Sequence, residues 1–473
     1  MIRFRPPRNF SLMSDNPFAK IPAVEKVLHA LETGTDPLPP IPRPLIAETV
    51  REEVDSLRAE VKGGKTDVAD FEIIVEGIRK TLVSLHRSRI HTVINGTGII
   101  IHTNLGRSPM SAETVELISA SARYYNNIEL DLETGERGPR GGYLERSLRL
   151  LCEAESATIV NNCAAALILI LRYLANGEKN EVIISRGELV EIGGGFRVPE
   201  IMETSGAKLR EVGATNKTSL ADYEKAITPN TGMLLKVHRS NFWMDGFIGE
   251  PTTEELVELG KKHGIPVVED LGSGAMIQTD SLAPIPHEPT AAEVLKRGVD
   301  LVCVSGDKLF GGAQAGIIAG RADLVAGLKK EPFFRALRCD KMILTAMQTV
   351  VSEYLAATDK PNLPLPTMLS LKPEDLQPRA EKIIAELGSD IPVWIGEGIA
   401  RCGGGTMPKA EIPSLTLDFR PENMSLDKLA KRLREGNTPV MGYKSDDAYR
   451  IDLRTIFPEQ DADLIENLKA AFA

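Results

Sequence analysis

A lysine that follows an apolar run is the first residue whose setting suggests covalent chemistry. Residues 302–312 read VCVSGDKLFGG, so Lys308 lies in a turn of small residues after a β-branched stretch. A lysine at the end of a buried strand can form a Schiff base with a carbonyl cofactor. Ser305, three residues earlier, could contact a phosphate. Taken alone, the pattern also fits a surface lysine in an ordinary strand–turn.

A carboxylate ends an apolar run upstream of this lysine. Residues 266–274 read PVVEDLGSG, which places Asp270 at the end of a predicted strand. Pyridoxal phosphate (PLP) needs an acidic partner for its pyridine nitrogen, because the protonated ring withdraws electrons from the substrate α-carbon. Asp270 fits this role, although an aspartate at a strand end is also a common turn residue.

A strand that leads into an alanine-rich helix supplies a third element. Residues 157–170 read ATIVNNCAAALILI, which places Asn162, Cys163 and Ala164 at a helix N-terminus. Backbone amides there can approach a phosphate, and the helix dipole favours the anion. An Asn N-cap without a ligand gives the same local pattern. The order of phosphate turn, aspartate strand and lysine strand is nevertheless what the aminotransferase-like PLP fold requires, so we predict PLP as cofactor and no metal.

The elements that position these residues alternate between strand and helix patterns. Helices are expected over 253–263 and 290–297. The β-branched runs that predict strands are 157–160, 181–185, 208–212, 233–237, 266–269 and 301–304. This alternation predicts an α/β fold with a mostly parallel central sheet. In such sheets ligands bind beyond the carboxyl ends of the strands.

Three domains are expected from the length of 473 residues and from changes in pattern along the chain. Residues 1–90 form a small helical N-terminal domain, in which a Pro-rich stretch over 36–44 separates a helix over 21–33 from a helical region over 45–89. Residues 91–358 form the PLP-binding catalytic domain. Residues 359–473 form a smaller α+β C-terminal domain.

Composition excludes several classes of protein. The net charge is −10, and basic and acidic side chains nearly balance in residues 1–90 (14 and 13), so no basic arm points to nucleic acid. Five cysteines without a CxxC pair argue against a disulfide framework and a zinc ribbon, and they favour a reducing cytoplasm. The longest apolar run, 163–171, is too short to cross a membrane.

Taken together, the motifs resemble those of bacterial selenocysteine synthase, the L-seryl-tRNA(Sec) selenium transferase family. The resemblance runs from about residue 20 to the C-terminus, through segments that general aminotransferases do not share. These segments are INGTGIIIHTNLGRS at 94–108, SRGELVEIGG at 185–194, VHRSNF at 237–242, EDLGSG at 269–274 and SGDKLFGG at 305–312.

The resemblance implies a reaction. L-seryl-tRNA(Sec) would lose water by PLP-dependent β-elimination, which gives an aminoacrylyl-tRNA, and selenium from selenophosphate would add to form L-selenocysteinyl-tRNA(Sec). Lys308 would hold the cofactor and act as the base at the α-carbon. The neighbouring Asp307 would assist proton transfer. His238, at a predicted strand end, would lie near the cofactor ring, although a lone histidine there is commonly structural.

The resemblance also assigns an anion site. Arg107, Arg335 and Arg338 match the family's anion-binding arginines, and guanidinium groups pair with phosphate oxygens in bidentate fashion. The spacing of Arg335 and Arg338 would place them on one helix face, which by itself also fits a solvated basic surface. Arg186, Glu188 and Glu191 could line the pocket or be solvated loop charges.

Further expectations follow from the resemblance alone. The N-terminal domain would recognise tRNA(Sec), and the protein would form a homodecamer of dimers with active sites at the dimer interfaces. One departure concerns residues 439–445, where Tyr443 and Lys444 follow a glycine in place of an expected arginine. Lys444 or Arg454 would then have to replace it.

Two other functions share part of this pattern. A related PLP lyase that acts on a small amino acid or an amino sugar phosphate would keep Lys308 and Asp270, but it would not need the N-terminal domain. A tRNA-binding scaffold with an inactive PLP fold would not need Lys308, Asp270 or Ser305. The presence of these residues together with the N-terminal domain favours the selenium transferase.

Overall fold

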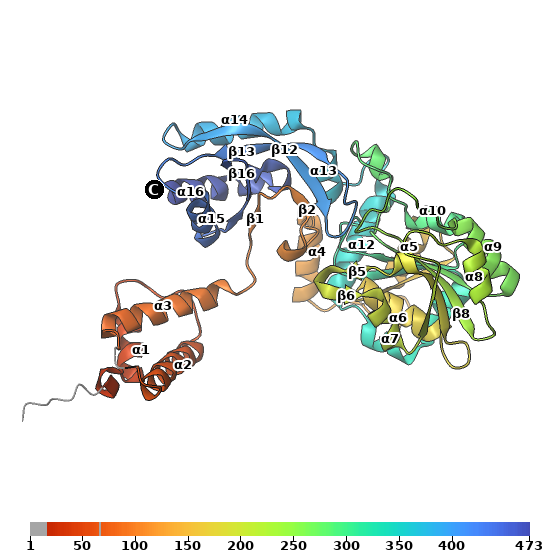
Figure 1. Cartoon of the computed structure of the whole chain (residues 1–473), viewed down its shortest axis with the longest axis horizontal. Coiled ribbons are helices and arrows are strands. Elements are labelled where there is room, and N and C mark those ends of the chain that lie inside the picture. Colours follow the sequence, from red (N-terminus) through yellow and green to blue (C-terminus); the bar gives the residue numbers. More distant parts are fainter. Residues whose placement is uncertain (1–16, 66–67) are drawn as a thin grey trace, which may run out of the picture. The chain divides into compact units, whose positions relative to one another are not determined.

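The computed structural model describes residues 17–65 and 68–473, which fall into two compact units, Met1–Thr92 and Val93–Ala473 (Figure 1). Residues 1–16 and 66–67 of the expected N-terminal domain lie outside the described residues. The first unit packs α1 (Val24–Thr33), α2 (Arg43–Lys62) and α3 (Phe71–Arg87) around a small apolar core. The predicted helical region over 45–89 is therefore two helices. The first ends at Lys62, and the backbone N–H of the next residue, Gly63, donates to the carbonyl of Ala59.

A seven-stranded sheet forms the centre of the second unit (Figure 1). Its order is β3-β11-β10-β9-β8-β4-β7, and only β11 runs antiparallel to its neighbours. The strands are β3 (Ser156–Val160), β4 (Glu181–Ser185), β7 (Lys208–Val212), β8 (Thr231–Val237), β9 (Val267–Gly272), β10 (Leu301–Ser305) and β11 (Gly316–Gly320). The predicted strands and the mostly parallel α/β fold are confirmed.

The apolar strands are buried because helices cover both faces of this sheet. Alternate residues of one strand belong to two different cores: Val302 and Val304 of β10 pack on one side, and Leu301 and Cys303 pack on the other. The helices on the first side are α5 (Gly142–Leu151), α9 (Thr253–His263), α10 (Ala291–Lys296) and α12 (Lys341–Ala356). Those on the second side are α6 (Cys163–Leu174), α7 (Val198–Ser205) and α11 (Ala322–Lys330). Burial on both faces explains why these strands read as continuous apolar runs.

A second sheet lies in the C-terminal part of this unit and includes a strand from far upstream. Its order is β15-β16-β13-β12-β2. Three helices pack against it and form an apolar core with it: α14 (Pro373–Leu387), α15 (Leu426–Glu435) and α16 (Asp461–Phe472). The strands are β2 (Ile99–Ile101), β12 (Val393–Gly403), β13 (Ile412–Phe419), β15 (Tyr443–Ser445) and β16 (Ala448–Asp452). β2 pairs in parallel with β12, and β1 (Ile94–Asn95) pairs with β14 (Val440–Met441). Residues 94–101 thus join the C-terminal strands, whereas the expected division grouped them with the central sheet.

All five cysteines are free thiols. Within residues 17–65 and 68–473, no helix has the length and apolar character needed to cross a membrane.

Candidate active site

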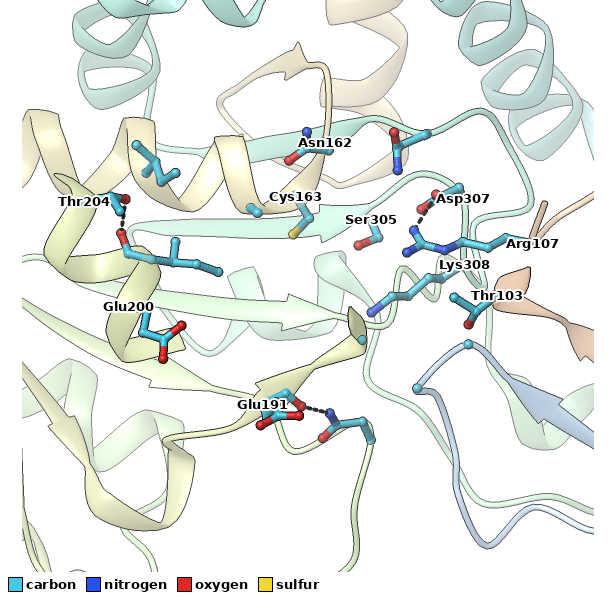
Figure 2. Close-up of a pocket in the computed structure, with 18 residues that line it drawn as sticks. Thr103, Arg107, Asn162, Cys163, Glu191, Glu200, Thr204, Ser305, Asp307 and Lys308 are labelled. Carbon is cyan, nitrogen blue, oxygen red and sulfur yellow. Dashed lines mark hydrogen bonds and ion pairs between the residues drawn. The ribbon is translucent and has the colours of Figure 1, made fainter. Parts of the chain in front are cut away.

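A cavity of about 850 Å³ lies beside the end of β10 and the N-terminus of α6, and we call it the lysine cavity (Figure 2). Its volume suits a cofactor together with a small reacting group. The predicted site residues in its lining are Arg107, Asn162, Cys163, Ala164, Ser305, Asp307 and Lys308. Residues that are distant in the sequence therefore meet at one edge of the sheet.

The turn that carries Lys308 is fixed by backbone hydrogen bonds. The N–H of Gly306 donates to the carbonyl of Ala315 at 2.8 Å, and the N–H of Gly311 donates to the carbonyl of Lys308 at 2.9 Å. The hydroxyl of Ser108 donates to the carbonyls of Asp307 (3.1 Å) and Lys308 (2.8 Å). Figure 2 shows the Lys308 side chain extending into the lysine cavity. Ser108 was not predicted, although it ends one of the recognised motifs.

Arg107 and Asp307 form an ion pair beside this lysine. Arg107 Nη1 lies 2.6 Å from Asp307 Oδ2, and the two side chains are 30% and 9% exposed. Arg107 has a backbone φ of 66°, a left-handed conformation that is uncommon for a residue with a side chain. Such strain persists only where surrounding contacts hold it, and here the N–H of Arg107 donates to the carbonyl of His102 at 3.0 Å.

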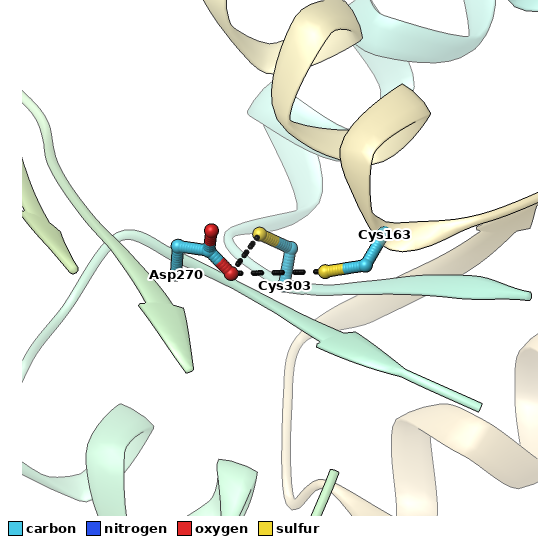
Figure 3. A group of neighbouring side chains, drawn as sticks. All are labelled: Cys163, Asp270 and Cys303. Carbon is cyan, nitrogen blue, oxygen red and sulfur yellow. Dashed lines mark hydrogen bonds between the residues drawn. The ribbon is translucent and has the colours of Figure 1, made fainter. Parts of the chain in front are cut away.

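Two thiols surround the carboxylate of Asp270 (Figure 3). The Sγ atoms of Cys163 and Cys303 lie 3.7 and 3.5 Å from Asp270 Oδ1. Burial raises the pKa of the Asp270 carboxyl, while the positive charge of Lys308 and the two thiols lower it. A carboxylate in this setting can pair with a protonated ring nitrogen.

The same three side chains also meet the distance requirement of a metal site, since their ligand atoms lie within 4.8 Å of one another. Metal ligation needs a thiolate. Hydrogen bonding with Cys163 and burial raise the pKa of Cys303 well above its usual value. In the structure this thiol donates toward Asp270, a contact that orients the carboxylate for the ring nitrogen of a cofactor.

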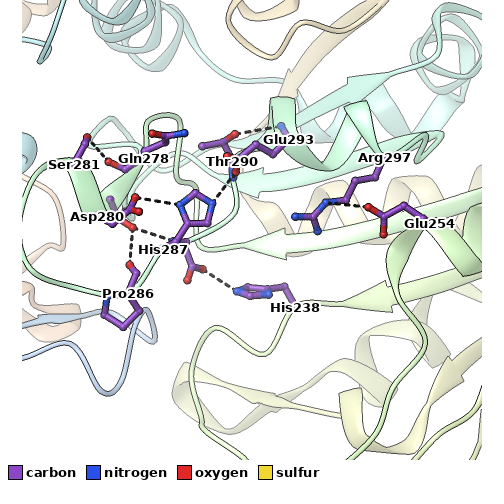
Figure 4. A network of polar contacts seen from close by, with 12 residues as sticks. His238, Glu254, Gln278, Asp280, Ser281, Pro286, His287, Thr290, Glu293 and Arg297 are labelled. Carbon is purple, nitrogen blue, oxygen red and sulfur yellow. Dashed lines mark hydrogen bonds and ion pairs between the residues drawn. The ribbon is translucent and has the colours of Figure 1, made fainter.

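His238 lies just after β8 and contacts Asp270 through the backbone. Its N–H donates to the Asp270 carbonyl at 2.9 Å, and its Nε2 lies 2.9 Å from Oε1 of the buried Glu288. Glu288 belongs to a segment held by His287, which contacts Asp280 and Glu293 (Figure 4). His238 is outside the described lining of the lysine cavity. No pattern in the sequence points to Glu288, because its partner lies 50 residues away.

The N-terminus of α6 is formed as the sequence predicts. The side-chain oxygen of Asn162 accepts from the N–H of Ala165 at 2.8 Å, so this side chain caps the helix. The first N–H groups of a helix have no carbonyl partner within it and can bind an anion. Because Asn162, Cys163 and Ala164 all line the lysine cavity, this helix end can hold a phosphate there.

Arg335 and Arg338 lie elsewhere in the single chain. They line a second cavity of about 520 Å³, which we call the basic cavity, together with Arg140, Lys329 and Lys330. Neither belongs to the described lining of the lysine cavity. The prediction that Arg335 and Arg338 share one helix face is wrong. Arg335 lies in a short 3-10 helix (Pro332–Leu337), and Arg338 comes directly after that helix, where the backbone is extended.

The other charged candidates are scattered. Glu191 lines the lysine cavity, whereas Arg186 is exposed and pairs with Glu211 at 3.0 Å. Arg454 is 1% exposed and donates to two backbone carbonyls, and Lys444 pairs with Asp427 at 2.7 Å. Neither Lys444 nor Arg454 is part of the lining described for the lysine cavity, so neither replaces the expected arginine within one chain.

Glu188 is a buried acid behind the site. It is 2% exposed, and its Oε2 accepts the N–H of Val237 at 3.0 Å, next to His238. Lys236 Nζ lies 3.7 Å from Oε1. Burial raises the pKa of Glu188 to about 7, although the charge of Lys236 lowers it. Its carboxyl supports the end of β8 and is not a solvated loop charge.

A lysine and a helix N-terminus line one cavity, and a half-buried aspartate contacts the lining residue Cys163. Together they define a PLP-dependent enzyme of the aminotransferase-like fold, fold type I. The structure of D-glucosaminate-6-phosphate ammonia-lyase shares this fold, with a TM-score of 0.57 and 20% identity over 81% of this chain and 96% of that one. The family model for L-seryl-tRNA selenium transferase matches residues 93–457. The chain belongs to this family.

Its relatives match along almost the whole chain. The L-seryl-tRNA(Sec) selenium transferase of Carboxydothermus hydrogenoformans is 44% identical over 93% of this chain and 94% of its own length. The corresponding protein of Aquifex aeolicus is 41% identical over 93% of this chain and 95% of its own. The similarity therefore includes much of the N-terminal unit as well as the catalytic region.

Proposed function

We propose that this protein converts L-seryl-tRNA(Sec) to L-selenocysteinyl-tRNA(Sec), with PLP as cofactor and selenophosphate as the selenium donor. Relatives that are 40–44% identical over most of the chain carry this activity in their names. The structural observation that carries the proposal is the position of Lys308, whose side chain enters a cavity that also contains a helix N-terminus and the Arg107–Asp307 pair.

The donor set of the lysine cavity fits PLP. Asp270 would pair with the pyridine nitrogen, the amides at the start of α6 and the hydroxyl of Ser305 would hold the phosphate, and Lys308 would hold the cofactor covalently. When bound, PLP acts as an electron sink that acidifies the α-carbon of the seryl group. His238, fixed by Glu288, would border the cofactor ring.

Residues of the chain would transfer the proton of the α-carbon and bind the selenophosphate anion. Once free, the amine of Lys308 takes the proton from the α-carbon and returns it to the β-hydroxyl oxygen, so that water leaves. Beside it, the Arg107 guanidinium pairs with the carboxylate of Asp307 and holds it in place. The remaining N–H groups of Arg107 can donate to the selenophosphate anion.

We place the complete anion site at an interface between two copies of the chain. Resemblance assigns Arg107, Arg335 and Arg338 to one site, yet the single chain divides them between the lysine cavity and the basic cavity. Contact between the basic cavity of one copy and the lysine cavity of another would reunite them. This arrangement accords with the homodecamer of dimers that the resemblance implies.

Other parts of the proposal concern the tRNA. We assign recognition of tRNA(Sec) to the helical N-terminal domain over 1–90, catalysis to residues 91–358 and a supporting role to the α+β region over 359–473. RNA can be recognised by shape with few phosphate contacts, which is compatible with a near-neutral N-terminal unit. An aminoacyl-tRNA substrate and five free thiols agree with a cytoplasmic protein.

The decisive experiment incubates the PLP-loaded full chain with seryl-tRNA(Sec) and radiolabelled selenophosphate. Selenocysteinyl-tRNA(Sec), identified after hydrolysis of the ester, is the expected product. Ammonia release from a small amino acid or an amino sugar phosphate, without any selenium transfer to tRNA, would instead support the lyase alternative.

A further inference from the structure

An exposed tryptophan carries a lysine over its ring in the loop that follows β8. Trp243 is 59% exposed, and the Nζ of Lys409 lies 4.2 Å from the ring centroid. The sequence contains only two tryptophans. A large exposed aromatic ring with an ammonium group beside it is a common arrangement for binding nucleotides, because bases stack on the ring and the cation attracts phosphate.

This pair lies at the rim of the lysine cavity. Asn241, two residues before Trp243, lines that cavity. So do Gly404 and Gly405, which belong to the β12–β13 connection that also carries Lys409. The two loops approach closely, since a Cβ at Gly405 would stand 3.3 Å from the Cβ of Asn241. The two loops therefore contact each other at two places. One is the cavity wall, where Asn241 lies against Gly405, and the other is the Trp243–Lys409 pair.

The loop is also anchored on the cavity side. The Nδ2 of Asn241 donates to the carbonyl of Glu191, another lining residue, at 2.7 Å. At its other end, Asn216 Nδ2 donates to the carbonyl of Phe247 at 2.6 Å. Anchors at both ends hold the ring of Trp243 near the opening, which lowers the entropy lost when a ligand binds.

We propose that Trp243 and Lys409 form a stacking site for the 3′-terminal nucleotide of the aminoacylated tRNA. This inference rests on the proposed function. The seryl group is esterified directly to the ribose of that nucleotide, so when serine lies beside Lys308 the terminal base must lie at the cavity rim. Trp243 stacks on the base, and Lys409 pairs with the adjoining phosphate.

Trp394 offers a matched control. It is 41% exposed and has the guanidinium of Arg420 5.8 Å from its ring centroid, but it lies at the start of β12 and outside the described lining of the lysine cavity. Replacement of either tryptophan removes an exposed ring beside a cation. Only Trp243 stands where the substrate's terminal nucleotide must pass.

The test measures binding of the PLP-loaded full chain to intact tRNA(Sec) and to the same tRNA without its three 3′-terminal nucleotides. Removal of these nucleotides should weaken binding to the unmodified protein by roughly 5- to 150-fold, the range of one base–aromatic stack. Trp243→Ala should bind intact tRNA about as weakly as the unmodified protein binds the shortened form. Trp243→Phe should keep most of the preference for intact tRNA, whereas Trp243→Leu should lose it and Trp394→Ala should keep all of it.

Two results would overturn the stacking site. One is a Trp243→Ala protein that still distinguishes intact from shortened tRNA as well as the unmodified protein does. The other is a change in molar mass by light scattering in Trp243→Ala, which would assign the ring to a contact between copies. Selenium transfer by the unmodified protein is measured in parallel, because its absence would refute the proposed function, whereas its presence with either result above would refute the stacking site alone.

Discussion

Arg107 and Asp307, 200 residues apart in the sequence, form an ion pair 2.6 Å long next to Lys308. The pair connects the segment after β2 to the turn after β10. Because the Asp307 side chain is only 9% exposed, Arg107 is the counter-ion of a carboxylate that water barely reaches. The contact therefore links the position of Lys308 to a strand of the C-terminal sheet.

Replacement of Arg107 should lower the stability of the folded protein. Arg107→Ala leaves a mostly buried carboxylate unpaired, which should lower the free energy of unfolding by about 2 kcal/mol. Urea denaturation measures this change. Arg186→Ala is the control, since Arg186 is exposed and pairs with Glu211, and its effect should stay within about 0.5 kcal/mol. Equal effects of the two variants would show that the Arg107–Asp307 pair carries no special energy.

Replacement of Lys308 should remove both the cofactor signal and the reaction. The unmodified protein should show a visible absorption band of covalently held PLP, and Lys308→Ala should lack it. Selenium transfer should fall by at least about 10³-fold, because holding of the cofactor and proton transfer are lost together. Lys296→Ala, which breaks an exposed pair with Glu153, should change neither readout. A Lys308→Ala protein with the normal band would assign the cofactor to another lysine.

A mixing experiment checks whether two copies build one anion site. Lys308→Ala and the double variant Arg335→Ala/Arg338→Ala should each be inactive alone. When they are co-expressed, half of the dimers are mixed and each mixed dimer has one intact site, so activity should recover to about a quarter of the normal value. Recovery no greater than the sum of the separate variants would place all the arginines and the lysine of one site in the same chain.

The buried acid Glu188 should make stability depend on pH. Its pKa is raised from 4.5 to about 7, mainly by burial, so the folded state holds its proton more tightly than the unfolded state. This contribution to stability is fully present below pH 4.5 and is lost as the pH rises to 7 and above, by up to about 3 kcal/mol.

Urea denaturation at pH 5 and pH 8 tests this dependence. The unmodified protein should lose stability between the two values, and Glu188→Gln should lose distinctly less because its side chain does not titrate. Glu153→Gln, at an exposed position, should behave as the unmodified protein does. The same pH dependence in Glu188→Gln would mean that other groups cause it.

The central sheet could be predicted from the sequence because its strands are buried on both faces. The predicted strands over 181–185 and 208–212 agree with β4 and β7 to the residue. In a parallel sheet the carboxyl ends of the strands lie at one edge, so a lysine, an aspartate and a helix N-cap that each follow a strand were expected to meet. The structure brings Lys308 and Asn162 to one cavity, with Asp270 close to the lysine.

The sequence could not reveal contacts that depend on tertiary packing. The hydroxyl of Ser108 reaches the carbonyl of Lys308 across 200 residues, and Glu288 reaches His238 across 50. The division of Arg107 from Arg335 and Arg338 was also hidden, because spacing along the chain describes local geometry and not which cavity a side chain enters. Pairing of β2 with β12 was missed because a three-residue apolar strand carries no sign of its partner.

The pairing of β2 with β12 also constrains how the chain folds during synthesis. Ile99 leaves the ribosome about 300 residues before its partner Arg401. During synthesis, β2 therefore has no hydrogen-bonding partner until β12 has been made, and the strands of the central sheet are made in between. We expect closure of the C-terminal sheet to fix the segment that carries Arg107, so that the lysine cavity is completed only after β12 has been made.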